Sequence, residues 1–210
     1  MKTSTKIMLS LLLIAIDIVY FGYEATLLNL NKITSLLFIN LYLDNYQKYL
    51  LIISTFFCVI MFALKIPFLQ PEFRVRIGNS FLNFIFKYIA VICISLSLYV
   101  LLMYVLVIYL FNFEIQEKIR YLYLFLELVS FFIVCMFIFL ISYFKTVKLT
   151  FSIMTVWILN FLFLVIINCF GFWLNKPVIN ILGLKIYKVI IIIYGTFFLL
   201  FKAEKTEIIT

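Results

Sequence analysis

Long apolar runs separated by short polar segments dominate the hydropathy pattern of this chain. A run of about 20 apolar residues is long enough to cross the hydrocarbon core of a bilayer as an α-helix. The pattern predicts six such helices, over about residues 7–23, 49–68, 88–111, 121–144, 149–172 and 186–201. It therefore indicates an all-α membrane protein in which residues 1–210 form a single transmembrane domain.

The segment Pro71–Tyr88 departs from this pattern, because its polar and apolar positions each recur three or four residues apart. Such spacing gives a helix one polar and one apolar face, and a helix of this kind lies along a membrane surface. The polar face comprises Arg76, Asn79, Asn83 and Lys87. We expect an interfacial amphipathic helix between spans two and three, with span three beginning at about Tyr88.

The distribution of basic residues predicts the orientation of the chain. Six spans place both termini on the same side, and ten of the 17 lysines and arginines then fall on that side against seven on the other. Cytoplasmic loops carry the excess of positive charge, so both termini are expected in the cytoplasm. Lys145 and Lys148, in the short loop between spans four and five, support this most directly. Lys188 is counted on the outer side.

Composition supports the same class of protein. The chain is 67% hydrophobic and 12% charged, whereas soluble domains are roughly 45–50% apolar and about 25% charged. The net charge of +8 comes from basic residues beside the apolar runs, where they meet anionic lipid headgroups. We therefore expect membrane lipid, and no nucleic acid, as a partner.

Several kinds of chemistry are not expected from this sequence. It contains no histidine, no phosphate-binding G-x-x-x-x-G-K-[ST] and no G-x-S-x-G nucleophile motif. Its four cysteines are isolated within apolar runs, where they act as small packing residues rather than as disulfides or ligands. We expect no catalytic residues, no metal site and no ATP hydrolysis by this chain.

Four polar residues inside predicted spans are candidates for a substrate path: Asp17, Glu127, Asn160 and Asn168. Ionisable groups at membrane depth mark ion or substrate pathways, or else they pair with a neighbouring helix. Glu127 lies about two turns from the outer end of its span, where Lys118 or Arg120 could pair with it. The alternative interpretation of all four is an interhelical hydrogen bond or ion pair.

The stretch Gly171–Lys185 is semi-apolar and is interrupted by Gly171, Pro177 and Gly183. Glycine and proline interrupt helices, so an unbroken span is not expected here. The sequence leaves two alternatives open, a surface loop or a pair of short re-entrant helices.

This layout resembles the small permease subunits of bacterial type-2 ABC exporters, in particular those of bacteriocin, lantibiotic or other peptide exporters. In that group an Arg-x-Gly-[Asn/Ser] element follows the second span, and here Arg76, Gly78 and Asn79 match it. The layout covers the whole chain, whereas the motif covers only about residues 71–87. A departure is the lack of a long amphipathic helix before span one.

The resemblance implies a function. Two permease subunits, identical or different, would pair with two cytoplasmic ATP-binding-cassette ATPases, which bind the ATP, so this chain needs no cofactor of its own. The coupling residues would be Glu72, Phe73, Arg74, Arg76, Gly78 and Asn79. The stretch Gly171–Gly183 would form outer re-entrant helices. A peptide or amphipathic antimicrobial would leave the cell by alternating access across a bacterial plasma membrane.

Two alternatives remain open. One is the substrate-binding membrane subunit of an energy-coupling vitamin importer, which also has six spans. Such subunits carry small-residue A-x-x-x-A packing in span one, but Leu11–Tyr20 contains only Ala15. The other is a membrane protein without transport activity, such as a self-immunity protein or the partner of a sensor.

Overall fold

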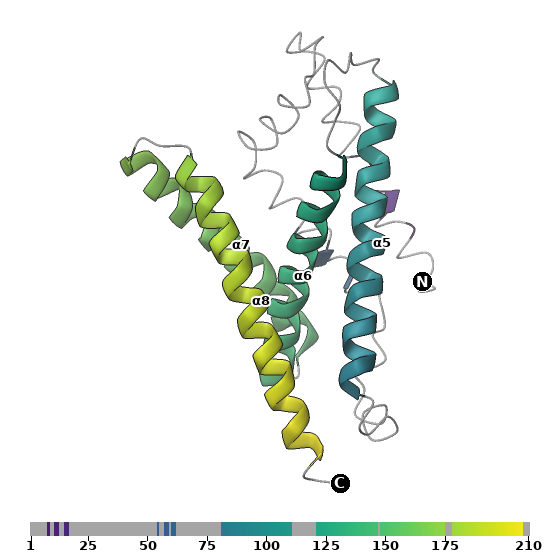
Figure 1. Ribbon diagram of the computed structural model, residues 1–210, viewed down its shortest axis with the longest axis vertical. Coiled ribbons are helices and arrows are strands. Elements are labelled where there is room, and N and C mark those ends of the chain that lie inside the picture. Colours follow the sequence, from purple (N-terminus) through teal and green to yellow (C-terminus); the bar gives the residue numbers. More distant parts are fainter. Residues whose placement is uncertain are drawn as a thin grey trace.

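The computed structural model is helical in the part of the chain that it describes, with the exception of Lys148 (Figure 1). It describes residues 81–110, 121–146, 148–174 and 178–207, and ten single positions: Met8, Leu11, Leu12, Ala15, Ile16, Ser54, Phe57, Cys58, Ile60 and Met61. The helices are α5 (Phe81–Leu110), α6 (Tyr121–Thr146), α7 (Leu149–Leu174) and α8 (Val178–Glu207). No strand occurs among these residues.

Each helix is long and apolar enough to contain a membrane span. The candidate spans are Leu82–Met103, Leu124–Thr146, Leu149–Ile167 and Gly183–Phe201. They correspond to the predicted spans three to six, so the class of membrane protein is supported. The ten single positions fall in the predicted spans one and two, and all ten are helical. The extent of those two spans, and hence the number six, lies outside the described residues.

Consecutive helices run in opposite directions (Figure 1). The beginnings of α5 and α7 therefore lie at the same end of the bundle as the ends of α6 and α8. Exposed lysines occur at this end, namely Lys87, Lys145 and Lys148. We call it the basic end.

Helix α6 is the centre of the bundle, because it packs against α5, α7 and α8. In an 18-residue window of its candidate span 61% is buried, compared with 22–33% in the corresponding windows of the other three spans. Its middle is an almost continuous run of buried residues, from Val134 to Leu140. Phe57 and Met61 belong to the same core, so the predicted second span contributes to it.

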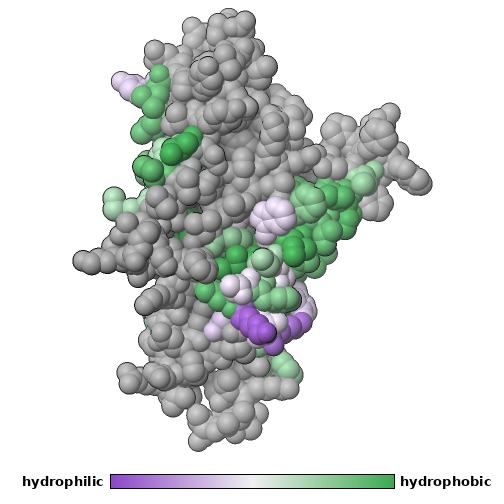
Figure 2. All heavy atoms as spheres, turned by 180° about the vertical axis from the view of Figure 1, so that it is seen from behind, coloured by the Kyte–Doolittle hydropathy of each residue, from purple (hydrophilic) through white to green (hydrophobic). Residues whose placement is uncertain are grey.

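The outer faces of the surrounding helices are apolar and exposed. They include Val91 and Leu102 on α5, Met154 on α7, and Val189 and Phe197 on α8. Figure 2 shows one such face, where apolar side chains spread over the described surface and hydrophilic ones gather toward its lower end. A water-soluble protein does not leave such surfaces uncovered, and lipid is their natural solvent.

The structure corrects the predicted start of span three. Phe81–Tyr88 were assigned to an interfacial helix, but they form the first two turns of α5, and the candidate span begins at Leu82. The predicted polar face remains, since Asn83 and Lys87 are exposed, but the buried face is formed by Ile85 and Ile89, whereas Phe84 and Tyr88 of the predicted apolar face are only half-buried. Residues 71–80, including the rest of that predicted helix, lie outside the described residues.

The structure also corrects both alternatives for Gly171–Lys185. Helix α7 continues through Gly171 to Leu174, and α8 begins at Val178, so only residues 175–177 separate them in sequence. The stretch is therefore the junction of two long helices and not a pair of short re-entrant ones. Helix α8 begins eight residues before predicted span six because the polar residues Asn180 and Lys185 lie within it, whereas the candidate span Gly183–Phe201 begins three residues earlier than predicted and ends where predicted.

Candidate functional site: a polar layer between α6, α7 and α8

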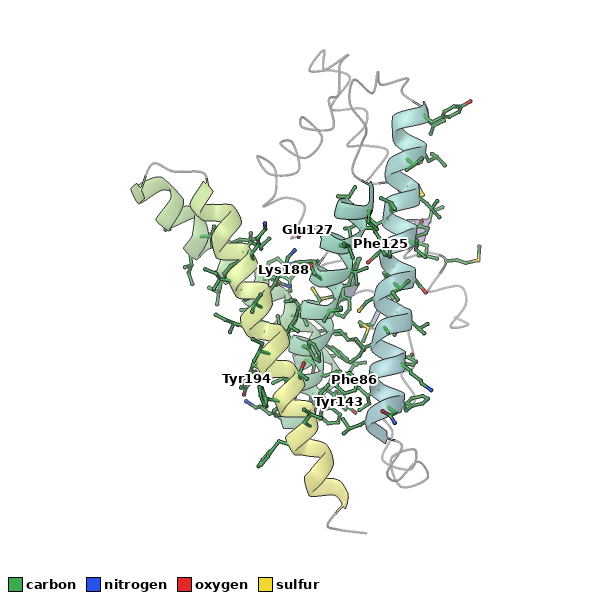
Figure 3. All side chains as sticks on the ribbon, viewed as in Figure 1. Phe86, Phe125, Glu127, Tyr143, Lys188 and Tyr194 are labelled. Atoms are coloured by element: carbon green, nitrogen blue, oxygen red, sulfur yellow. The ribbon has the colours of Figure 1, made fainter. Side chains whose placement is uncertain are left out.

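Two ionisable side chains meet inside the helical bundle. Glu127 lies in the first two turns of α6, and Lys188 lies three turns into α8. Both positions are inside candidate membrane spans. Their side chains are 20% and 7% exposed, respectively. Figure 3 shows them pointing toward each other from the two helices.

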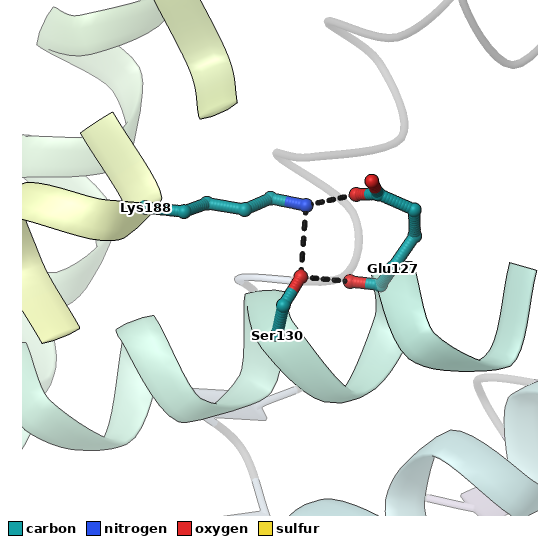
Figure 4. Close-up of polar contacts among 3 residues, drawn as sticks. All are labelled: Glu127, Ser130 and Lys188. Carbon is teal, nitrogen blue, oxygen red and sulfur yellow. Dashed lines mark hydrogen bonds and ion pairs between the residues drawn. The ribbon is translucent and has the colours of Figure 1, made fainter. Parts of the chain in front are cut away.

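The lysine makes two contacts with α6 (Figure 4). Its ammonium group forms an ion pair with Oε2 of Glu127 and donates a hydrogen bond to the hydroxyl of Ser130 at 3.0 Å. The Ser130 hydroxyl in turn donates to the backbone oxygen of Glu127 at 2.8 Å. The Ser130 hydroxyl thus donates a hydrogen bond to the backbone of Glu127 and at the same time accepts one from Lys188.

This pairing explains how a charged lysine is accommodated at a buried position. An unpaired charge in a membrane is costly, and such residues pair with one another or reach water. Removing one partner of a buried pair leaves the other charge uncompensated, which typically costs about 3–5 kcal/mol. Glu127 and Lys188 therefore form an interdependent unit that joins α6 to α8.

A second polar cluster surrounds Asn160 of α7, whose side chain is 2% exposed. Its amide group donates to Oγ of Ser54 at 3.2 Å and to Sγ of Cys135 on α6 at 3.5 Å. Its carbonyl oxygen accepts a hydrogen bond from the hydroxyl of Tyr187 on α8 at 3.1 Å. Asn160 thus makes interhelical hydrogen bonds, which is the predicted alternative to a role in a substrate path.

The two clusters are joined by consecutive residues of α8. Tyr187 contacts Asn160 of α7, and its ring stacks on Phe163 with centroids 3.8 Å apart. The next residue, Lys188, contacts α6. Consecutive side chains on a helix point about 100° apart, so α8 reaches both neighbours at one level. We call the whole set the polar layer, comprising Ser54, Glu127, Ser130, Cys135, Asn160, Tyr187 and Lys188.

The polar layer has the chemistry of helix association and charge pairing. No group of three or more metal-ligating side chains occurs among the residues that the structure describes. All four cysteines are free, which confirms the prediction that they form no disulfide. Three are buried, whereas Cys169 is exposed. The groups that can respond to a charged ligand are Glu127 and Lys188.

The predicted site residues are distributed unevenly over the structure. Glu127 and Asn160 are brought into the polar layer, from α6 and α7. Asn168 lies in α7, but its side chain is outside the described residues. Also outside are the other predicted positions: Asp17, Glu72, Phe73, Arg74, Arg76, Gly78 and Asn79. Lys118 and Arg120, the expected partners of Glu127, are likewise not described.

Sequence reasoning missed the roles of Lys188 and Tyr187. Lys188 was assigned to the outer side, but it is 5% exposed and paired inside the bundle. The available signal was its position directly before the apolar run Val189–Ile193. A lysine there, in a chain with an acid inside another span, is a candidate for an intramembrane pair.

No family model, curated protein or solved structure matches this chain. The interpretation of the polar layer therefore depends on the contacts described above.

Proposed function

We propose that this chain is the permease subunit of an ATP-driven exporter in a bacterial plasma membrane. The observation that carries the proposal is the exposed basic end, at which the described part of α5 begins. Lys87 on α5 and Lys145 and Lys148 around the α6–α7 turn are exposed there. This is the arrangement expected where a membrane bundle meets a cytoplasmic partner and anionic lipid.

The continuity of α5 gives the proposal a mechanical basis. A helix transmits displacement along its axis, and α5 extends without interruption from Phe81 to Leu110. Ile85 and Ile89 on its first turns are buried against the core that α6 dominates. A force applied to residues 72–79 by an ATPase would therefore reach α6 through α5.

The partners follow from this proposal. A separate ATP-binding-cassette ATPase binds and hydrolyses the ATP, and a second permease subunit completes the transport path. The exported cargo is a peptide or an amphipathic antimicrobial. Glu127, Asn160, Asp17 and Asn168 are the candidates for its path.

The test is co-purification in mild detergent with charge reversal in the coupling segment. The tagged wild-type chain is expected to bring down an ATP-binding-cassette ATPase in stoichiometric amount. The variant R74E/R76E should lose most of that ATPase, by about tenfold or more, because two like charges are reversed at the proposed contact. Its amount in the membrane should stay unchanged.

A matched control reverses two charges at the basic end. K145E/K148E changes the net charge equally but leaves residues 72–79 intact, so it should retain the ATPase. Equal retention by both variants would contradict the coupling role of Arg74 and Arg76. Absence of any ATPase from folded, monodisperse wild-type protein would contradict the permease function itself.

A second candidate is a membrane immunity or sensor-partner protein without transport activity. The observation that favours it is the direct α7–α8 junction, because the exporter resemblance implied re-entrant helices at that position. This candidate predicts no stoichiometric ATPase. It also predicts that R74E/R76E leaves resistance to a peptide antimicrobial unchanged.

A further inference from the structure

Helix α8 carries a stripe of buried positions, two of which face α6. The stripe consists of Leu184, Lys188, Gly195 and Leu199, with Lys188 and Gly195 two helical turns apart. Lys188 contacts Ser130 of α6, and Gly195 faces Phe137 of α6. Both intervals are seven residues, so α6 and α8 run in the same direction and stay in register over two turns.

The two halves of α8 differ in the contacts that hold them. The first half is held by polar groups, through the pair with Glu127 and the hydrogen bond from Tyr187 to Asn160, in addition to the stack of Tyr187 on Phe163. The second half is held by apolar packing without an ion pair among the described residues. There Gly195 lies against Phe137, and the ring of Phe198 lies 6.5 Å from that of Phe144.

This division has a physical consequence. Apolar packing does not respond to the charge of a side chain, whereas an ion pair is lost when either partner is neutralised. The pair also lies near one end of both spans, about 5 Å past Leu124 and about 8 Å past Gly183 along the helix axes. Glu127 is partly exposed, so the pair is within reach of a competing charge.

We propose that the Glu127–Lys188 pair is a releasable latch that holds the first half of α8 against α6 and α7. The close packing at Gly195 is the fixed point about which this half moves. When the pair breaks, Tyr187 leaves Asn160, and the layer around Cys135 opens. This inference depends on the α6–α8 contacts and does not require the proposed transport function.

The native cysteines provide the measurement. Cys135 lies in the polar layer and is 0% exposed, so its rate of labelling by a membrane-permeable maleimide reports opening of the first half of α8. Cys93 on α5 is equally buried and serves as the internal reference. Exposed Cys169 confirms that the reagent is active. Labelling is quantified peptide by peptide by mass spectrometry of the full chain in membrane vesicles.

The variants E127Q and K188M each remove one charge and should raise Cys135 labelling by about tenfold, with Cys93 unchanged. A tenfold rise corresponds to about 1.4 kcal/mol, and the cost of about 3–5 kcal/mol for leaving one buried charge unpaired would give a larger rise. The charge exchange E127K/K188E should restore protection. The matched control K185M removes an exposed lysine one turn earlier and should leave labelling at the wild-type rate.

Several results would overturn the latch. One is an unchanged rate of Cys135 labelling in folded E127Q and K188M. Another is an equal rise of that rate in K185M. A third is labelling of Cys135 in E127K/K188E that is as fast as in the single variants. If a single variant fails to reach the membrane, E127Q/K188M replaces it, because it leaves no uncompensated charge. Protection of Cys135 at the wild-type rate in that variant would also contradict the proposal.

Discussion

At the scale of single residues, Gly195 explains how closely α6 and α8 can approach. A Cβ atom at this position would lie 2.5 Å from Cγ and 2.8 Å from Cβ of Phe137. Cβ and Cγ of Phe137 are close to the backbone of α6, so rotating the phenylalanine ring cannot move them away from the added Cβ. Membrane helices commonly pack through small residues for this reason.

The variant G195A should therefore destabilise the protein by about 1–3 kcal/mol, the usual range for overpacking. The measurement is thermal or denaturant unfolding of the purified protein in detergent. The matched control is G183A on the same helix, where the added Cβ would meet Cδ1 of Ile167 at 3.2 Å. That atom is the end of a flexible side chain, so we expect a smaller effect. Equal stability of G195A and wild type would contradict the close α6–α8 contact.

Lys188 shows why part of the polar layer could not be predicted from the sequence. A local pattern treats a lysine beside Asn180 and Lys185 as part of a polar loop. Its burial depends on Glu127, which is 61 residues away in sequence. Only the folded arrangement of α6 and α8 brings the two together. Glu127 itself was predictable, because an acid inside an apolar run is conspicuous in any sequence.

At the scale of helices, the position at which α6 ends and the position at which α7 begins were each predicted to within two residues. The reason is that Lys145 and Lys148 interrupt two long apolar runs at the turn between them. The beginnings of α5 and α8 were predicted too late. There the polar residues lie on a helix face, and hydropathy alone cannot separate an amphipathic turn of a span from a preceding segment.

The central position of α6 leads to a prediction about truncation. Leu140 of α6 is 0% exposed, and replacing it with alanine should cost about 2–5 kcal/mol of stability, because a cavity is left in the core. Leu162 of α7 is 48% exposed on an outer face, and its replacement should cost much less. Unfolding of the variants L140A and L162A under the same detergent conditions measures both effects. Similar losses would contradict the assignment of α6 as the centre.

At the scale of the whole molecule, α5 to α8 form a bundle, and most of the exposed lysines among its described residues lie at the basic end. Lys87, Lys145 and Lys148 are exposed at that end, whereas Lys185 is exposed near the beginning of α8, at the other. The excess of positive charge favours a cytoplasmic location for the basic end. The permease proposal requires this orientation, because the coupling segment must meet a cytoplasmic ATPase.

The most direct measurement is the side of the membrane from which each end can be labelled. Single cysteines are introduced as K148C and K185C in a chain whose native cysteines are replaced by serine or alanine, and intact cells are treated with a membrane-impermeant maleimide. We predict that K185C is labelled in intact cells and that K148C is labelled only after the membrane is permeabilised. Labelling of both from the same side would contradict a membrane-crossing bundle, and the reverse pattern would contradict a cytoplasmic basic end.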